Sequence, residues 1–291
     1  MLDNATGQPA ADAHGRLDDG VYVVTGGTQG LGAAAARLFA ARGARGLILC
    51  GRNRANGDAL AAELSRAGCD ARFVEADLTD VHAAQAAIAE AERAFGTLHG
   101  LVNAAGSTDR GTILDTSPEL YDKLLALNLR APFFLMQTAA QVMRRHGVAG
   151  AIVNVGSMSG HAGQPFIAAY CAAKGGLASL TRNTAYALMR DRIRVNQINP
   201  GWMDTPAEHE IQRQAHARPP DWLDDAEAAQ PFGRLLKPAE VARAIAFLAS
   251  DESGLMTGGV IDFDQSVVGA YDAPPQPADA LADPNGPGAP A

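Results

Sequence analysis

The sequence predicts an α/β protein: a doubly wound parallel sheet of about seven strands with helices on both faces. Two observations lead to this fold class. Short β-branched or Leu-rich runs alternate along the chain with Ala- and Leu-rich stretches of helical length, a rhythm typical of strand–helix units in a parallel sheet. A glycine cluster also follows the first of these runs, at a junction where such sheets commonly bind a ligand.

The elements can be assigned in order. Seven segments have the composition of strands: Val21–Thr25, Gly46–Cys50, Ala71–Glu75, Gly100–Asn103, Ala151–Val155, Arg192–Ile198 and Val260–Phe263. Six segments have the length and composition of helices: residues 31–42, 55–67, 80–95, 117–146, 169–189 and 238–250. Because parallel strands point the same way, the residues that follow each strand gather along one edge of the sheet. We therefore expect the functional residues directly after the strands.

The alternating part, residues 20–270, forms one domain in this interpretation. Residues 1–19 are polar and without periodicity and predict a flexible arm. Residues 271–291 are rich in Pro, Ala and Gly, which predicts a disordered tail. The interval 201–237 interrupts the alternation at the carboxyl end of a strand, where a long insertion is usually functional. We interpret it as a substrate-binding insertion, the alternative being a surface excursion.

Composition excludes several classes of partner. The net charge of -8 and the pI near 5.3 argue against binding to nucleic acid or to an anionic membrane, which need a basic surface. The chain has no apolar run of the roughly 18–20 residues that span a bilayer, and its N-terminus does not resemble a secretory signal. Its three cysteines, Cys50, Cys69 and Cys171, form no CxxC pair. These features predict a cytoplasmic protein with reduced thiols and no metal site.

The glycine cluster predicts a dinucleotide site. Residues Thr25–Gly32 read TGxxxGxG and lie between the first strand and the first helix. Glycines allow a tight turn close to a pyrophosphate, and the helix N-terminus offers free N–H groups. A glycine cluster alone is a weak signal, but its place in an alternating chain makes it specific. The candidate cofactor contacts in this loop are Gly26, Thr28, Gln29, Gly30, Leu31 and Gly32.

Arg52 favours NADP(H) over NAD(H). It follows the second strand, 20 residues after Gly32, and no acidic residue lies between positions 46 and 57. An acidic residue at about this distance binds the ribose 2′-hydroxyl of NAD, whereas an arginine accommodates the 2′-phosphate of NADP. The alternative is that Arg52 is a solvated loop residue.

The third and fourth strands end in further candidate cofactor contacts. Asp77 and Leu78 follow the third strand, where the carboxylate could accept a hydrogen bond from the adenine amino group; Asp77 could instead cap the next helix, a role for which Asp80 competes. The small residues after the fourth strand would let the backbone approach the cofactor. The candidates there are Asn103, Ala104 and Gly106.

Tyr170 and Lys174 predict an acid/base pair. Four residues apart at the start of a helix, they lie on one face. An ammonium group beside a phenol favours the phenolate and lowers its pKa towards the range that general acid/base catalysis needs. Ser157, just past the fifth strand, could bind the substrate oxygen, and Asn128 could bind a water that connects Lys174 to solvent. Taken alone, Ser157 could equally be a turn residue and Asn128 an exposed helix position.

This ordered set of motifs, together with Pro200-Gly201, resembles the short-chain dehydrogenase/reductase family over roughly residues 18–265. The resemblance implies a Rossmann-type fold, hydride transfer between NAD(P) and an alcohol or ketone, and a catalytic tetrad of Asn128, Ser157, Tyr170 and Lys174. It also implies that Tyr170, Lys174, Pro200, Gly201 and Thr205 lie near the nicotinamide half of the cofactor, and that the protein is a homotetramer or homodimer.

The sequence departs from the family pattern at two places that bear on function. Gln29 stands where NADP-preferring members often carry a basic residue, which weakens the preference that Arg52 suggests. Residues 262–266, DFDQS, replace the glycine-rich segment common after the last strand. Their acidic and amide groups could reach a neighbouring active site in an oligomer.

The substrate is the least determined part of the interpretation. Candidate substrate contacts are Ser157, Ser159, His161, Gln164 and Trp202, which would suit a sugar, polyol or similar hydroxylated compound. A 3-ketoacyl or other apolar ketone is an alternative, because the insertion also offers apolar surface. A cofactor-binding sensor without enzymatic activity, or an epimerase or dehydratase on the same fold, are further alternatives; turnover of cofactor with a free carbonyl substrate would separate them.

Overall fold

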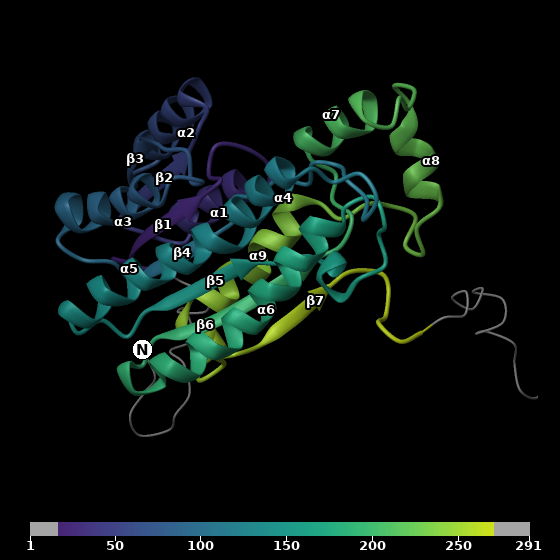
Figure 1. Cartoon of the computed structure of the whole chain (residues 1–291). Coiled ribbons are helices and arrows are strands. Elements are labelled where there is room, and N and C mark those ends of the chain that lie inside the picture. The colour runs from purple at the N-terminus through teal and green to yellow at the C-terminus, as the bar shows by residue number, and fades with distance from the viewer. Residues whose placement is uncertain (1–16, 271–291) are drawn as a thin grey trace, which may run out of the picture.

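The computed structural model describes residues 17–270 and contains a seven-stranded sheet (Figure 1). All neighbouring strands are parallel, in the order β3-β2-β1-β4-β5-β6-β7. The strands are β1 (Val21–Thr25), β2 (Gly46–Gly51), β3 (Asp70–Glu75), β4 (Gly100–Asn103), β5 (Ala151–Val155), β6 (Arg194–Pro200) and β7 (Val260–Phe263). The order reverses between β1 and β4, and this reversal creates the crevice in which such sheets bind ligands. The predicted fold class is confirmed.

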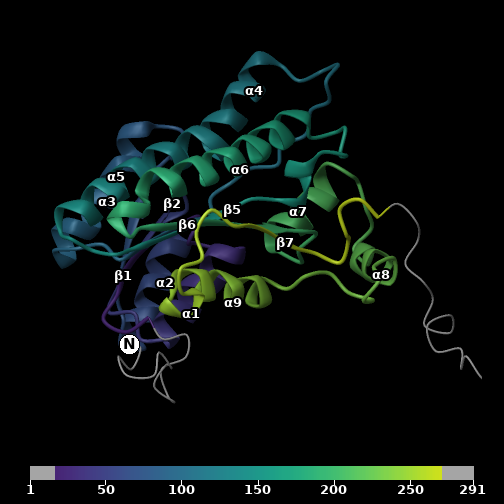
Figure 2. The same cartoon turned by 90° about the horizontal axis from the view of Figure 1, so that it is seen from below.

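Helices cover both faces of the sheet. The α-helices are α1 (Gly30–Ala41), α2 (Arg54–Arg66), α3 (Val81–Phe95), α4 (Pro118–Leu125), α5 (Ala131–Arg145), α6 (Ala168–Leu188), α7 (Pro206–Gln214), α8 (Trp222–Ala228) and α9 (Pro238–Ala249). Helices α1, α2 and α9 lie on one side and α3, α5 and α6 on the other (Figure 2). Side chains of β1 alternate between the two layers, with Tyr22 and Val24 in one core and Val21 and Val23 in the other. Because both faces are covered, central strands such as β1, with the sequence VYVVT, are apolar along most of their length.

The predicted helix 117–146 is interrupted. Helix α4 leads into a π-helical turn, Ala126–Arg130, which leads into α5. Within this turn, the Asn128 side-chain amide donates to the carbonyl of Leu124 at 3.0 Å. A side-chain donor on a backbone carbonyl competes with the regular helical ladder, and such one-turn π-bulges often lie at functional sites. The prediction of one continuous helix over residues 117–146 is therefore wrong at residues 126–130.

The packed domain begins before residue 20. Leu17 is only 2% exposed, lies in the core beside α1, and its N–H donates to the carbonyl of Arg42 at 2.8 Å. The predicted boundary of the N-terminal arm therefore lies too late in the chain. The rest of that arm, residues 1–16, and the predicted tail, residues 271–291, lie outside the described residues. No helix between residues 17 and 270 is long and apolar enough to cross a membrane.

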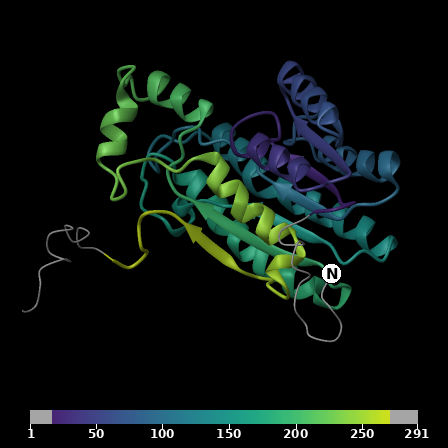
Figure 3. The ribbon, with the colours of Figure 1, turned by 180° about the vertical axis from the view of Figure 1, so that it is seen from behind.

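The insertion 201–237 is a small helical unit beyond the carboxyl ends of the strands, at the right of Figure 1 and at the left of Figure 3. Helices α7 and α8 enclose a core of their own, formed by Trp222, Ala226 and Leu235. A β-bridge between Met203 and Leu236 joins the two ends of the unit. The insertion thus has a fixed base next to the sheet edge where the crevice opens.

Candidate active site

The turn between β1 and α1 requires glycine. Gly26 has a φ of +64°, and a Cβ there would lie 2.8 Å from the Cα of Ala105. A Cβ on Gly32 would lie 2.2 Å from the carbonyl oxygen of Gly26. The turn is therefore packed without room for side chains, both against the loop after β4 and against its own helix.

The N-terminus of α1 is open to an anion. Its N-cap residue, Gln29, makes no capping hydrogen bond through its side chain, and the first turn carries no acidic residue. The first N–H groups of a helix need an acceptor, and a phosphate supplies one. Thr28 lies against the end of β2 at Gly51, and Leu31 is buried. This uncapped helix end behind a glycine turn fits the diphosphate of a dinucleotide.

Thr25 connects the turn to the loop after β4, a role that the sequence interpretation missed. Its hydroxyl oxygen accepts hydrogen bonds from the N–H groups of Ala104 at 3.1 Å and Ala105 at 3.3 Å. Asn103 is buried and donates through Nδ2 to Oδ1 of Asn154 at 2.8 Å, whereas its own Oδ1 has no partner among residues 17–270. The small residues after β4 are thereby held beside the glycine turn.

Arg52 and Asp77 lie at the same edge, after β2 and β3. Both side chains are exposed. Asp77 accepts from the N–H and the hydroxyl of Thr79, each at 2.9 Å, and these bonds lower its pKa, with a smaller contribution from Arg52. Asp80 caps α3 by accepting from the N–H of His82, so Asp77 is not the cap. Leu78 is buried next to it.

Tyr170 and Lys174 lie on the first turns of α6, only 8% and 4% exposed. The Lys174 ammonium lies 5.6 Å from the centre of the Tyr170 ring and donates to the carbonyl of Val155, at the end of β5, at 2.7 Å. The Tyr170 hydroxyl is hydrogen-bonded to Ser157. The structure therefore brings together three of the four predicted catalytic side chains at the carboxyl end of β5.

Burial sets the pKa values of this pair. Desolvation raises the pKa of Tyr170 to about 12, and the hydrogen bond with Ser157 lowers it only in part. Desolvation also lowers the pKa of Lys174 to about 8. The sequence predicted that Lys174 would lower the pKa of Tyr170. In the free protein the pKa is raised instead, because removing a phenolate from water costs more free energy than the neighbouring groups supply by stabilising it.

Asn128, the fourth predicted catalytic residue, is fully buried rather than exposed on a helix. Its Oδ1 accepts from the N–H of Ser107 at 3.3 Å, and its Nδ2 donates to the Ser107 carbonyl at 3.0 Å. A Cβ on Gly106 would lie 2.9 Å from Oδ1 of Asn128 and 3.7 Å from Nζ of Lys174. The π-helical turn therefore places Asn128 next to Gly106, on the side that faces Lys174.

The polar candidates after β5 are paired with one another or with β7. Ser157 caps the short 3₁₀ turn Met158–His161 by accepting from the N–H of Ser159 at 3.1 Å. The hydroxyl of Ser159 donates to Oε1 of Gln164 at 2.8 Å. Nε2 of His161 lies 2.8 Å from Oδ1 of Asp262. Each of these side chains thus has a partner within the protein, which limits the groups left for a substrate.

The acidic segment 262–266, which begins within β7, also forms hydrogen bonds within its own chain. Asp262 accepts from Nδ2 of Asn199 at 2.9 Å as well as contacting His161. Gln265 accepts from the N–H of Phe232 and donates to the carbonyl of Arg234. The sequence analysis suggested that the acidic and amide groups of this segment could reach a neighbouring subunit. In the structure, Asp262 and Gln265 have hydrogen-bond partners within their own chain.

Trp202 packs inside the insertion. Its ring stacks on Trp222 with 5.9 Å between centroids, and its indole N–H donates to Glu208 at 2.8 Å. Thr205 caps α7 by accepting from the N–H of Glu208, and it lies 3.9 Å from where a Cβ on Gly30 would stand. Pro200 ends β6 and Gly201 follows it. The insertion therefore begins directly beside the glycine turn.

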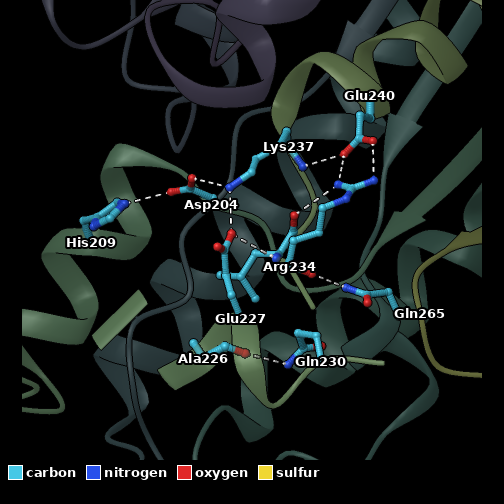
Figure 4. Close-up of polar contacts among 10 residues, drawn as sticks. Asp204, His209, Ala226, Glu227, Gln230, Arg234, Lys237, Glu240 and Gln265 are labelled. Carbon is cyan, nitrogen blue, oxygen red and sulfur yellow. Dashed lines mark hydrogen bonds and ion pairs between the residues drawn. The ribbon is translucent and has the colours of Figure 1, made fainter. Parts of the chain in front are cut away.

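Ion pairs fix the base of the insertion (Figure 4). Lys237 binds Asp204 at 2.9 Å and Glu227 at 2.8 Å. Asp204 also contacts His209 of α7 at 2.8 Å. The lysine, which precedes α9, thus links the segments at both ends of α7 and α8 to the main domain.

Comparison with known proteins agrees with this geometry. The family model described as enoyl-(acyl carrier protein) reductase matches residues 26–266. The chain is 37% identical to the cis-4-hydroxycyclohexanecarboxylate dehydrogenase of Sinomonas cyclohexanicum, over 84% of this chain and 94% of that protein. It is 35% identical to the 2,5-dichloro-2,5-cyclohexadiene-1,4-diol dehydrogenase LinX of Sphingobium indicum, over 86% and 96%.

A solved structure shares the whole fold. A variant actinorhodin polyketide ketoreductase, crystallised with NADPH, superposes with a TM-score of 0.79 at 28% identity and covers 85% of this chain and 96% of its own. Together with the glycine turn and the Ser157, Tyr170 and Lys174 arrangement, these matches assign the protein. The chain belongs to the short-chain dehydrogenase/reductase family and is an NAD(P)-dependent oxidoreductase.

Proposed function

We propose that the enzyme interconverts a secondary alcohol and a ketone with Tyr170 as the general acid/base. The observation that supports this most strongly is the buried Tyr170 hydroxyl, hydrogen-bonded to Ser157 and beside Lys174. A buried phenol with a hydroxyl partner can hold a substrate oxygen and exchange a proton with it. When bound, the nicotinamide ring supplies or accepts the hydride.

Each residue of the tetrad has a distinct task in this proposal. In reduction, Tyr170 donates its phenolic proton to the carbonyl oxygen while Ser157 donates a hydrogen bond to the same oxygen. Lys174 stabilises the phenolate that forms, because a cation next to the ring favours the charged state. Asn128 holds the loop after β4 through Ser107 and so keeps Gly106 close to Lys174. In oxidation, the same groups remove the proton from the alcohol.

Tyr170→Phe tests the mechanism. We expect it to retain cofactor binding and to lose activity by about 10²- to 10⁴-fold, the usual contribution of general acid/base catalysis. Tyr186→Phe is the matched control, because Tyr186 lies on the same helix and is 78% exposed. Both variants are compared by initial rates and by a fluorescence titration with the cofactor. Full activity of Tyr170→Phe would refute the proposed acid/base.

NADP(H) is the proposed cofactor, and Arg52 is the proposed 2′-phosphate ligand. In support, the guanidinium is exposed directly after β2, on the edge that carries the glycine turn. We expect Arg52→Asp to favour NAD(H), because a carboxylate repels the phosphate and can accept from a ribose hydroxyl. Arg66→Asp, at the far end of α2, is the control. An unchanged ratio of the two affinities would contradict the assignment.

The proposed substrate is a ring-bearing secondary alcohol with further polar groups, or the corresponding ketone. The named relatives support a ring, because their names describe a hydroxycyclohexanecarboxylate and a cyclohexadiene diol as substrates. Polar groups after β5, on the half-buried Ser157, the buried Ser159 and the exposed Gln164, support a hydroxylated compound. A panel of cyclic ketones and sugars, assayed by NADPH consumption, distinguishes this class from acyclic apolar ketones.

The proposal extends to assembly and location. Helices α4, α5 and α6 and the π-helical turn between them form a groove lined by Leu125, Leu129, Arg130, Phe133 and Leu180, and exposed apolar surface rimmed by polar residues often marks an interface. We propose that this face pairs copies of the chain in a homodimer or homotetramer, which light scattering would measure. The three cysteines form no disulfide, which supports a cytoplasmic location.

A further inference from the structure

Arg110 lies in the loop between β4 and α4, on one wall of the crevice. Its neighbour Gly111 donates through its N–H to the carbonyl of Phe166 at 2.9 Å, and the Gly111 carbonyl accepts from the N–H of Ala168 at 3.1 Å. These bonds attach the loop to the residues that lead into α6, two positions before Tyr170. The side chain of Arg110 therefore belongs to the surroundings of the proposed acid/base.

Three groups hold the guanidinium. Nη1 donates to the carbonyl of Thr108 at 2.8 Å. Nε and Nη2 both point at Nε2 of His216, at 3.3 and 3.2 Å. The guanidinium carbon lies 5.3 Å from the centre of the Phe166 ring, and the His216 ring meets the same ring edge-on at 5.9 Å. His216 lies between α7 and α8, so this cluster joins the insertion to the crevice wall.

The charge of Arg110 is not matched by a carboxylate. Between residues 17 and 270, no carboxylate oxygen lies within 4.0 Å of its guanidinium nitrogens, and the neighbouring Asp109 pairs with Lys123 instead. By contrast, Arg54 and Arg234 pair with Glu75 and Glu240. Its Nε and Nη2 share one nitrogen lone pair of His216, since a neutral imidazole has a single acceptor. That edge of a guanidinium is the one that binds both oxygens of a carboxylate, through two charge-assisted hydrogen bonds.

We propose that Arg110 binds a carboxylate group of the substrate, with the Phe166 ring and the Thr108 carbonyl holding the guanidinium in place. The inference rests on the proposed function and narrows its substrate class to hydroxy acids and keto acids. The incoming carboxylate replaces His216 as the acceptor for Nε and Nη2 and gives each donor an oxygen of its own. Arg110 is also close enough for its charge to lower the pKa of Tyr170, which supports a site near the reacting oxygen.

The test compares a keto acid with its neutral ester. Wild-type enzyme and Arg110→Gln are assayed for NADPH-dependent reduction of 4-oxocyclohexanecarboxylate and of its methyl ester. We expect Arg110→Gln to lower kcat/KM for the acid by about 10- to 100-fold, mainly through KM, because a hydrogen bond to a charged group has this effect. The ester should change by less than about threefold, as for a surface substitution.

Two further variants sharpen the comparison. Arg110→Lys keeps the positive charge but loses the two parallel N–H donors of the guanidinium, so it should keep only part of the activity with the acid. Arg190→Gln, an exposed arginine in the 3₁₀ turn at the far end of α6, should leave both substrates unchanged. An equal loss of activity with acid and ester in Arg110→Gln would overturn the proposal and make Arg110 a general support of the insertion.

A binding experiment separates this proposal from the proposed function. Cyclohexanecarboxylate and cyclohexanecarboxamide are titrated into the NADPH-loaded protein, with the fluorescence of Trp202 and Trp222 as the signal. We expect the carboxylate to bind the wild type more tightly than the amide, and this preference to vanish in Arg110→Gln. If neither ketone is reduced but the preference is found, the reaction assignment fails and the anion site stands. If the wild type has no preference for the carboxylate, the anion site is refuted even if the ester is reduced.

Discussion

Gly32→Ala offers a quantitative test of the cofactor turn. An added Cβ would stand 2.2 Å from the carbonyl oxygen of Gly26, and real Cβ atoms essentially never come closer than 3.0 Å to another heavy atom. The turn must therefore move by at least 0.8 Å, the difference between these distances. The atoms that a Cβ on Gly32 would meet are backbone atoms of Gly26 and Gly27. Rotation of a side chain therefore cannot relieve the clash.

A shift of this size removes at least one N–H group from reach of the diphosphate. A hydrogen bond to a charged group contributes about 1.5–3 kcal/mol, which corresponds to roughly a 10- to 100-fold rise in the Kd for NADPH. The Kd is measured by fluorescence titration, and circular dichroism and Tm show whether the fold is kept.

Gly68→Ala is the control for loss of stability alone. Gly68 follows α2, has a φ of +99° and has no atom within 4 Å of the position of a Cβ. Alanine in this left-handed conformation should destabilise the protein by about 1 kcal/mol while the Kd stays unchanged. If Gly32→Ala binds NADPH as tightly as the wild type, the turn tolerates the displacement and the reasoning is refuted.

Two further predictions concern the proposed acid/base pair, Tyr170 and Lys174, and the base of the insertion. Burial raises the pKa of Tyr170 to about 12, so the rate of alcohol oxidation, which needs the phenolate, should rise with pH, while the rate of ketone reduction should stay level near neutrality. Lys174→Met should move the pH profile of oxidation to still higher pH, because the cation that favours the phenolate is lost. An unchanged pH profile would contradict the role of the lysine. Lys237→Met removes the cation that binds Asp204 and Glu227 (Figure 4). KM should rise by about 3- to 10-fold with little change in kcat, because part of the substrate's binding free energy is then used to order the insertion. The Tm should fall by only a few degrees, because a pair that is 41% exposed on the lysine side contributes about 0–1 kcal/mol; an unchanged KM would show that the insertion does not depend on this lysine.

The sheet and the glycine turn were predictable because their signals are local. A strand buried on both faces is apolar along its length, and all seven strands were found at nearly their observed positions. The turn needs glycine at fixed positions between one strand and one helix, so its spacing is visible in the sequence.

The interruption at Asn128 could not be predicted in the same way. Residues 117–146 have a helical pattern throughout, and nothing within that segment shows that Asn128 binds Ser107, which lies 21 positions earlier in the loop after β4. The π-helical turn depends on that distant contact. The sign of the pKa shift of Tyr170 has the same origin, because the spacing to Lys174 is local but the burial of both residues is a property of the whole fold.

The substrate candidates show a related difficulty, since a polar side chain can bind a ligand only with groups that the protein has not already engaged. His161, Gln164 and Trp202 were chosen for their functional groups, but each has a hydrogen-bond partner within the chain. Arg110 has no motif around it and was overlooked, although two of its donors share one acceptor. Whether donors and acceptors balance depends on tertiary contacts, so the assignment of an anion site had to wait for the structure. The same reasoning predicts that the substrate specificity of this protein depends more on Arg110, two of whose donors share one acceptor, than on Trp202, which packs inside the insertion.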